Sequence, residues 1–119
     1  MIASIALLAV SVAAAEYSPP RTGNVDKKEF VCMMQDMVML RKGIPLTSGG
    51  KKYWGCCEMC KVKIEAEPER YTKAVDLVSG KRVDKATAHI YALEGLVYYF
   101  ESKRTRSAFA ASPSRYLQQ

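Results

Sequence analysis

The chain has few of the residues on which most catalytic sites depend. Its 119 residues include one histidine and one tryptophan. It contains no glycine-rich phosphate loop and no nucleophile–base signature. The histidine, His89, stands among Ala88, Ile90 and Tyr91, where a structural role is favoured over ligation. These absences argue against hydrolytic and phosphate-transfer chemistry, and we expect the protein not to be an enzyme.

The N-terminal region has no hydrophobic run long enough to span a bilayer and no charged side chain before Glu16. Ile2–Ala15 is an uninterrupted run of apolar and small residues, but it is too short to cross a bilayer. Ala13–Ala15 supplies an A-x-A cleavage site, so residues 1–15 are interpreted as a secretory signal peptide and the mature protein as periplasmic or secreted, without a stable membrane span. Because no Lys or Arg precedes the run, the signal is atypical or starts upstream; a short membrane anchor is the alternative.

Positive charge is present without clustering. The formal net charge is +6 at pH 7, yet lysines and arginines are scattered and interspersed with acidic residues. A basic surface attracts nucleic acid or anionic lipid through a sequence-independent interaction. An exported protein meets little nucleic acid, so we interpret the charge as a solvated surface and expect no nucleic-acid partner.

The four cysteines are distributed unevenly, with three of them in the stretch Gly49–Cys60. Tyr53-Trp54 is typical of the end of a strand, and Gly55 allows a tight turn into a helix that begins among the cysteines. Thiols at the start of a helix face free backbone N–H groups and the positive end of the helix dipole, which favour the thiolate. Since the thiolate is the form that binds metal, this arrangement predicts a metal site.

Disulfide bonding is an alternative use of the four cysteines in a short exported chain. Bridging the neighbours Cys56 and Cys57 would be strained, which leaves Cys32 paired with one of them and Cys60 with the other. Very short loops gain little from closure, so three cysteines this close together make poor crosslinks and good ligands. A disulfide-stapled interaction module stays open as a hypothesis. A thiol–disulfide oxidoreductase using Cys57 and Cys60 is another, although the βαβ setting of a thioredoxin fold is missing.

An internal repeat organises the chain from residue 30 onward. At an offset of 45 residues, glycines, tyrosines and prolines coincide without a gap: Gly50 with Gly95, Tyr53 with Tyr98, Pro68 with Pro113 and Tyr71 with Tyr116. Each unit, 30–74 and 75–119, is expected to form a strand, a turn, a short helix and a Pro-x-x-Tyr ending. Residues 16–29 show no hydrophobic periodicity and are expected to be a flexible leader.

The second unit lacks every thiol of the first. At the offset of 45 residues, Cys56 aligns with Glu101, Cys57 with Ser102 and Cys60 with Thr105. If the offset increases by two residues, Cys32 aligns with Ser79. The simplest interpretation is one metal-binding copy and one structural copy that pack together.

These residues resemble two families of small heavy-metal-binding modules, YHS and TRASH. The YHS pattern runs from Val-Cys-Gly-Met through a Gly-x-x-Tyr-Tyr-Phe-Cys strand and turn to a further Cys and Pro-x-x-Tyr. This sequence matches that order with Val31–Met34, Gly50–Cys56, Cys60 and Pro68–Tyr71. The TRASH pattern, one Cys, a spacer and then Cys-x-x-x-Cys, is similar to the arrangement of the first, second and fourth cysteines. The second unit resembles the YHS pattern without its thiols.

The resemblance implies an α+β fold of two small repeated units, each a short β-hairpin or knuckle followed by a short helix. The metal knuckle of the first unit would be zinc-finger-like and treble-clef-like. The resemblance further implies metal sensing, trafficking or resistance rather than catalysis. The residues that it carries over are Cys32, Cys56 and Cys60.

Sulfur donors set the expected metal, because thiolates and thioethers select Cu(I) or Zn over hard cations. Adjacent Cys56 and Cys57 point in different directions at a helix start, so Cys32, Cys56 and Cys60 suit a three-coordinate Cu(I) centre. Met34 is a candidate extra donor because it would share a strand face with Cys32, although core packing is the commoner role of methionine. A tetrahedral zinc site that includes Cys57 is the alternative. A metal-transport or metalloprotein partner would receive the ion by stepwise thiol exchange.

Overall fold

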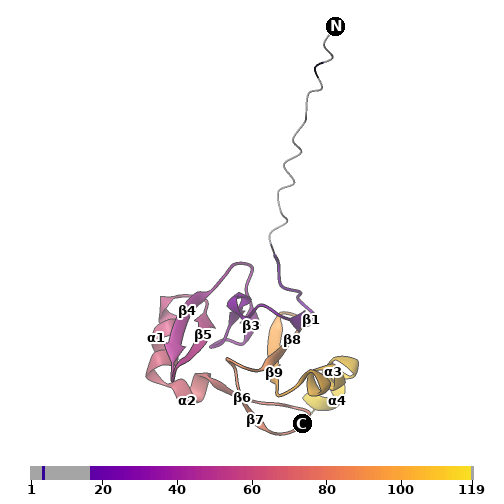
Figure 1. Cartoon of the computed structure of the whole chain (residues 1–119). Helices are drawn as coiled ribbons and strands as arrows, with labels where there is room; N and C mark the ends of the chain where they lie inside the picture. The colour runs from indigo at the N-terminus through magenta and orange to yellow at the C-terminus, as the bar shows by residue number, and fades with distance from the viewer. Residues whose placement is uncertain (1–3, 5–16, 119) are drawn as a thin grey trace.

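The computed structural model describes residue 4 and residues 17–118, and the predicted signal peptide lies outside them apart from residue 4. The described chain has an α+β fold with small antiparallel sheets and short α-helices (Figure 1). The predicted fold class, two hairpin-and-helix units, is therefore confirmed. Within the described residues, no helix is both long enough and apolar enough to cross a membrane.

The hairpin-and-helix elements of the two units begin at positions that differ by 45 residues. The first unit contains β4 (Ile44–Ser48), β5 (Lys51–Gly55), α1 (Glu58–Ala66) and α2 (Pro68–Tyr71). The second contains β8 (His89–Leu93), β9 (Leu96–Phe100), α3 (Lys103–Ala111) and α4 (Pro113–Leu117). A residue with positive φ precedes β5 and β9 alike, at Gly50 and Gly95, and a proline occupies the first position of α2 and of α4, where its missing N–H costs nothing. The same local signals therefore build both units.

The largest sheet joins the two units, with the strand order β1-β8-β9-β3-β2. Its remaining strands are β1 (Gly23–Val25), β2 (Val31–Cys32) and β3 (Met37–Val38). Strand β3 pairs with β9 through Met37 and Leu96. The buried core also includes both units, because Met33 and Ile64 of the first unit pack in one cluster with Ile90 and Tyr99 of the second. The units therefore share one core.

Residues 17–29, which belong to the segment expected to be a flexible leader, contain ordered structure. Strand β1 pairs with β8 over three residues, from Gly23↔Ala92 to Val25↔Ile90, and a 3-10 helix, η1, follows at Lys28–Phe30. The side chains of Val25 and Phe30 are buried. A three-residue strand carries no visible periodicity, and it forms because the edge of β8 supplies its partner.

Each unit contains a turn, here called its knuckle, at residues 32–36 in the first unit and 76–80 in the second. The residues of the two knuckles align differently from our prediction. In the first unit, the N–H of Asp36 donates to the Cys32 carbonyl at 2.8 Å, and Asp36 has a positive φ. In the second, the N–H of Gly80 donates to the Asp76 carbonyl at 2.8 Å, and Gly80 has a positive φ. The structural counterpart of Cys32 is therefore Asp76, and the expected overlay on Ser79 is wrong.

The second knuckle lies between strands β6 (Lys73–Val75) and β7 (Arg82–Asp84), which pair with each other. Strand β6 begins before the expected boundary between residues 74 and 75. The second unit thus starts about at Lys73, and its knuckle is longer than the turn between β2 and β3.

Candidate metal centre

Three thiols from separate parts of the first unit meet at one point. Cys32 ends β2, Cys56 follows β5, and Cys60 lies in the first turn of α1. Their Sγ atoms all lie within 4.8 Å of one another. The Cys32 and Cys60 sulfurs are 3.9 Å apart, and those of Cys56 and Cys60 are 3.1 Å apart. The predicted convergence of Cys32 on the later cysteines is therefore present.

Backbone hydrogen bonds and a glycine hold the segments in this arrangement. The N–H of Met33 donates to the Trp54 carbonyl at 2.9 Å, which ties the knuckle to β5. Gly55 lies so close to α1 that a Cβ built on it would stand 3.0 Å from the Cβ of Cys60. A side chain at position 55 would crowd Cys60, which would have to move by a few tenths of an ångström, so the glycine lets the helix start close against the strand.

Access to the cluster is one-sided. Cys32 and Cys60 are buried, with exposed fractions of 0% and 2%, whereas Cys56 and Cys57 are exposed. Buried thiols form the floor of the site and exposed thiols its rim. An ion or a competing ligand would therefore enter from the side of Cys56 and Cys57.

The thiol pKa values differ according to position. The pKa of Cys57 is lowered, first because the backbone N–H of Cys60 donates to its sulfur, as expected at the start of a helix. The pKa of Cys60 is raised, mainly by burial. The pKa of Cys56 is raised, first by its hydrogen bond to Cys60 and then by burial. Crowded thiols keep protons that a metal ion would displace, so binding is expected to release protons.

The sulfur positions fit a soft ion. With a metal–sulfur bond of about 2.3 Å, sulfurs lie about 3.8 Å apart around a tetrahedral ion and about 4.0 Å apart around a trigonal one. The distance of 3.9 Å between Cys32 and Cys60 agrees with either geometry. The distance of 3.1 Å between Cys56 and Cys60 is shorter. For either geometry, the separation of the Cys56 and Cys60 sulfurs would have to increase by about 0.7–0.9 Å on metal binding.

Cys57 and Met34 occupy different places relative to this cluster. Cys57 is the N-cap residue of α1, and its sulfur lies 3.7 Å from that of Cys60, at the rim. Met34 is half-buried in the turn after β2 and packs against the hydrophobic core. Its contacts are those of a core residue, and its service as a metal donor stays a prediction.

Sequence reasoning missed three side chains that lie behind the Cys32 knuckle: Lys85, Asp36 and Tyr99. Lys85 is only 3% exposed and bonds to the knuckle. The pKa of Tyr99 is raised well above its ordinary value by burial and by Asp36, so its hydroxyl remains a donor. A lone lysine between Asp84 and Ala86 is typical of a surface loop, and no periodic pattern distinguishes it.

The close approach of Gly55 to Cys60 leads to a prediction. Gly55→Ala is expected to push Cys60 away and to weaken metal binding, since overpacking a close contact costs about 1–3 kcal/mol. That corresponds to a fall in affinity of about 5- to 150-fold if the strain falls on the bound state. Competition with a chromophoric chelator measures the change. Thr47→Ala, on the exposed face of the adjacent strand β4, is the control, and an unaltered affinity in Gly55→Ala would contradict the prediction.

Comparison of the chain with family models, with curated proteins and with solved structures finds no match.

Proposed function

We propose that this protein binds a soft metal ion, Cu(I) or Zn(II), through Cys32, Cys56 and Cys60, and that it acts in metal trafficking, sensing or resistance. The observation that carries the proposal is the meeting of three thiols from separated segments within 4.8 Å. All four cysteines are free thiols in this arrangement. Sulfur-only donor sets select soft ions over Mg²⁺ or Ca²⁺.

Two forms of the site are proposed, and they differ in ligand number. Three-coordinate Cu(I) would use Cys32, Cys56 and Cys60. Tetrahedral Zn(II) would recruit Cys57, whose sulfur lies 3.7 Å from that of Cys60. The spacing of the buried pair fits both, so the metal must be identified by analysis of the protein.

Transfer of the ion to a partner protein belongs to the same proposal. The exposed rim lets a partner thiolate approach the ion while Cys32 and Cys60 still hold it from the buried side. Each exchange then replaces one metal–sulfur bond by another, and the ion never becomes free in water. The resemblance to YHS and TRASH modules supports this role, and the apolar segment Ile2–Ala15 supports an exported location.

The test begins with protein purified under anaerobic conditions, in which bound metal and free thiols are counted per chain. One equivalent of Cu(I) or Zn(II) is expected. Trp54 is the only tryptophan and stands two residues before Cys56, so its fluorescence is expected to report the titration. Cys56→Ser should lose stoichiometric Cu(I) binding, whereas Cys57→Ser should keep it. A protein whose metal content is the same in wild type and Cys56→Ser would contradict the proposal.

A second candidate function rests on Cys57 and Cys60. Their sulfurs are 3.7 Å apart at the start of α1, and the pKa of Cys57 is lowered, which is the arrangement of an attacking thiol beside a resolving one. A thiol–disulfide oxidoreductase would reduce a small disulfide substrate with catalytic turnover, and Cys57→Ser would abolish that activity. The metal-binding function predicts instead that Cys57→Ser leaves Cu(I) stoichiometry unchanged. A disulfide-stapled module would show no free thiols at all.

A further inference from the structure

One buried lysine of the second unit bonds directly to the knuckle that carries Cys32. Its Nζ donates to the Met33 carbonyl at 2.7 Å and to Asp36 Oδ1 at 2.8 Å. Lys85 is 3% exposed, and its ammonium also lies 5.1 Å from the centre of the Tyr99 ring. A buried ammonium needs such partners, because burying an unpaired charge is costly. The lysine therefore fixes the position of the residue next to Cys32.

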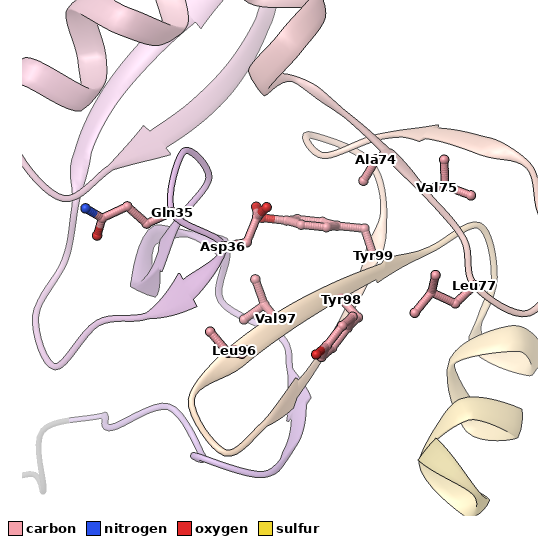
Figure 2. A pocket seen from close by; sticks show the side chains of 9 residues that line it. All are labelled: Gln35, Asp36, Ala74, Val75, Leu77, Leu96, Val97, Tyr98 and Tyr99. Carbon is pink, nitrogen blue, oxygen red and sulfur yellow. The ribbon is translucent and has the colours of Figure 1, made fainter. Parts of the chain in front are cut away.

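The same knuckle is held by a second contact from β9. The hydroxyl of Tyr99 donates to Asp36 Oδ1 at 2.8 Å, so Asp36 accepts from both Lys85 and Tyr99. Figure 2 shows the carboxylate of Asp36 and the phenol of Tyr99 pointing toward each other beside a cavity of about 280 Å³ that both residues line. The N–H of Val97 also donates to the Asp36 carbonyl at 2.9 Å.

The backbone at Asp36 indicates that its side chain matters. Asp36 has a φ of 53°, in the left-handed region that glycine adopts most easily. Its counterpart in the second knuckle, Gly80, has a φ of 74°. Glycine would remove the strain at position 36 but would also remove the carboxylate that receives Lys85 and Tyr99.

We propose that Lys85 is a positioning residue for the metal site: through the Met33 carbonyl and Asp36, it holds Cys32 in ligating position before any ion arrives. This inference rests on the proposed function. Ordering a knuckle at the moment of binding would lower affinity, and a knuckle ordered in advance avoids that loss. Groups that orient metal ligands typically change metal affinity by about 10- to 100-fold when they are removed.

The test compares two substitutions of buried cations in the second unit. Lys85→Met removes the knuckle contacts. Arg106→Met is the matched control, because Arg106 is 8% exposed, contacts the Ile90 carbonyl at 3.4 Å and Asp26 at 3.6 Å, and does not bond to the knuckle. Zn(II) and Co(II) affinities are measured by competition with a chelator. Lys85→Met is expected to lose about 10- to 100-fold in affinity, and Arg106→Met to stay within about threefold of wild type.

The absorption spectrum of bound Co(II) supplies a readout that a general loss of stability would not move. In Lys85→Met the thiolate-to-cobalt charge-transfer band should weaken or shift because Cys32 is displaced, whereas Arg106→Met should keep the wild-type band. Tyr99→Phe, which removes one hydrogen bond and keeps the apolar ring, should show a smaller change in the same direction. If Lys85→Met does not fold, the affinity and spectrum of Tyr99→Phe take its place in the test. Wild-type affinity and spectrum in Lys85→Met, or in Tyr99→Phe when Lys85→Met is unfolded, would overturn the inference.

A measurement without metal separates this inference from the proposed function. In chains that keep Cys32 as the only cysteine, reaction with a chromogenic thiol reagent reports how well that buried thiol is held. Lys85→Met should accelerate the reaction by at least about tenfold, and Arg106→Met should not. Should the wild type bind no metal, the proposed function fails, while the labelling rates still decide whether Lys85 holds Cys32. Equal rates in all three proteins would overturn the positioning role.

Discussion

Cys60→Ser is expected to abolish metal binding more completely than any other single change. The sulfur of Cys60 is the centre of the cluster, with the sulfurs of Cys32, Cys56 and Cys57 at 3.9, 3.1 and 3.7 Å. Structural zinc sites contribute about 10–16 kcal/mol, or about 3–5 kcal/mol for each ligand of a three- or four-ligand site. Removing one ligand therefore corresponds to a fall in affinity of about two to three and a half orders of magnitude.

The loss at Cys60 should be local. Serine is close in size to cysteine, and the aromatic cluster around Phe109 lies in the second unit, where Tyr91, Tyr98 and Phe100 contact it. Circular dichroism and the thermal midpoint of the metal-free protein should therefore stay near the wild type. Elemental analysis after gel filtration measures the retained metal. Stoichiometric metal in Cys60→Ser would refute a site centred on this thiol.

Asp76→Asn is expected to destabilise the second unit strongly. Asp76 is fully buried, and its carboxylate accepts from the N–H groups of Val78 at 2.8 Å, Ser79 at 3.0 Å and Glu101 at 2.9 Å. The asparagine side chain keeps one acceptor oxygen, and its NH₂ group would point at a backbone N–H group that now donates to the carboxylate. Hydrogen bonds to a charged group are worth about 1.5–3 kcal/mol each, so a loss of about 2–4 kcal/mol in unfolding free energy is expected.

Urea unfolding measures this loss, and Asp26→Asn is its control. Asp26 has an exposed side chain paired with Arg106 at 3.6 Å, and exposed pairs contribute about 0–1 kcal/mol. Equal unfolding free energies for Asp76→Asn and wild type would show that the carboxylate is dispensable.

The carboxylate of Asp76 makes the unfolding free energy depend on pH in the acidic range. Burial alone would raise the pKa of Asp76, but the N–H donors of Glu101, Ser79 and Val78 outweigh it, and the pKa is lowered. Its contribution is therefore present above the unfolded-state value of about 3.9 and is lost as pH falls through the folded-state value. The difference in unfolding free energy between wild type and Asp76→Asn should accordingly shrink below about pH 4. A difference that does not change between pH 3 and pH 7 would contradict this assignment.

Asp76 also explains why the second unit needs no thiols. It stands where Cys32 stands in the first unit, and Glu101 stands where Cys56 does. The bond from the Glu101 N–H to Asp76 joins the knuckle to the end of the hairpin directly. In the first unit the side chains at the corresponding positions, Cys32 and Cys56, are thiols, and a metal ion bound between them would add to the backbone bond from the Met33 N–H to the Trp54 carbonyl.

The hairpins and helices could be predicted from sequence because short-range signals specify them. Gly50 and Gly95 mark turns, Pro68 and Pro113 mark helix starts, and both sets recur at one offset. Each of these features depends on a few neighbouring residues. The approach of Cys32 to Cys56 and Cys60 spans 24 or more residues and was predicted instead from the YHS-like and TRASH-like spacing of the cysteines.

The features that could not be predicted depend on distant partners. Strand β1 exists because β8 offers an edge, and three residues such as Gly23–Val25 do not show this alone. The match of Cys32 with Asp76 became visible only from backbone hydrogen bonds, since a change of knuckle length shifts the register. Lys85 is a polar residue in a polar loop until the fold buries it against Asp36.

The five-stranded sheet takes strands from opposite ends of the described chain, since β1 at Gly23–Val25 pairs with β8 at His89–Leu93 and β9 in turn pairs with β3. Pairings that close loops of this length are slow to form, because their entropy is lost before their contacts are gained. During synthesis, β1 cannot pair until β8 has emerged from the ribosome. The turn that carries Cys32 likewise lacks its contacts with Lys85 and Tyr99 until the chain has emerged through β9.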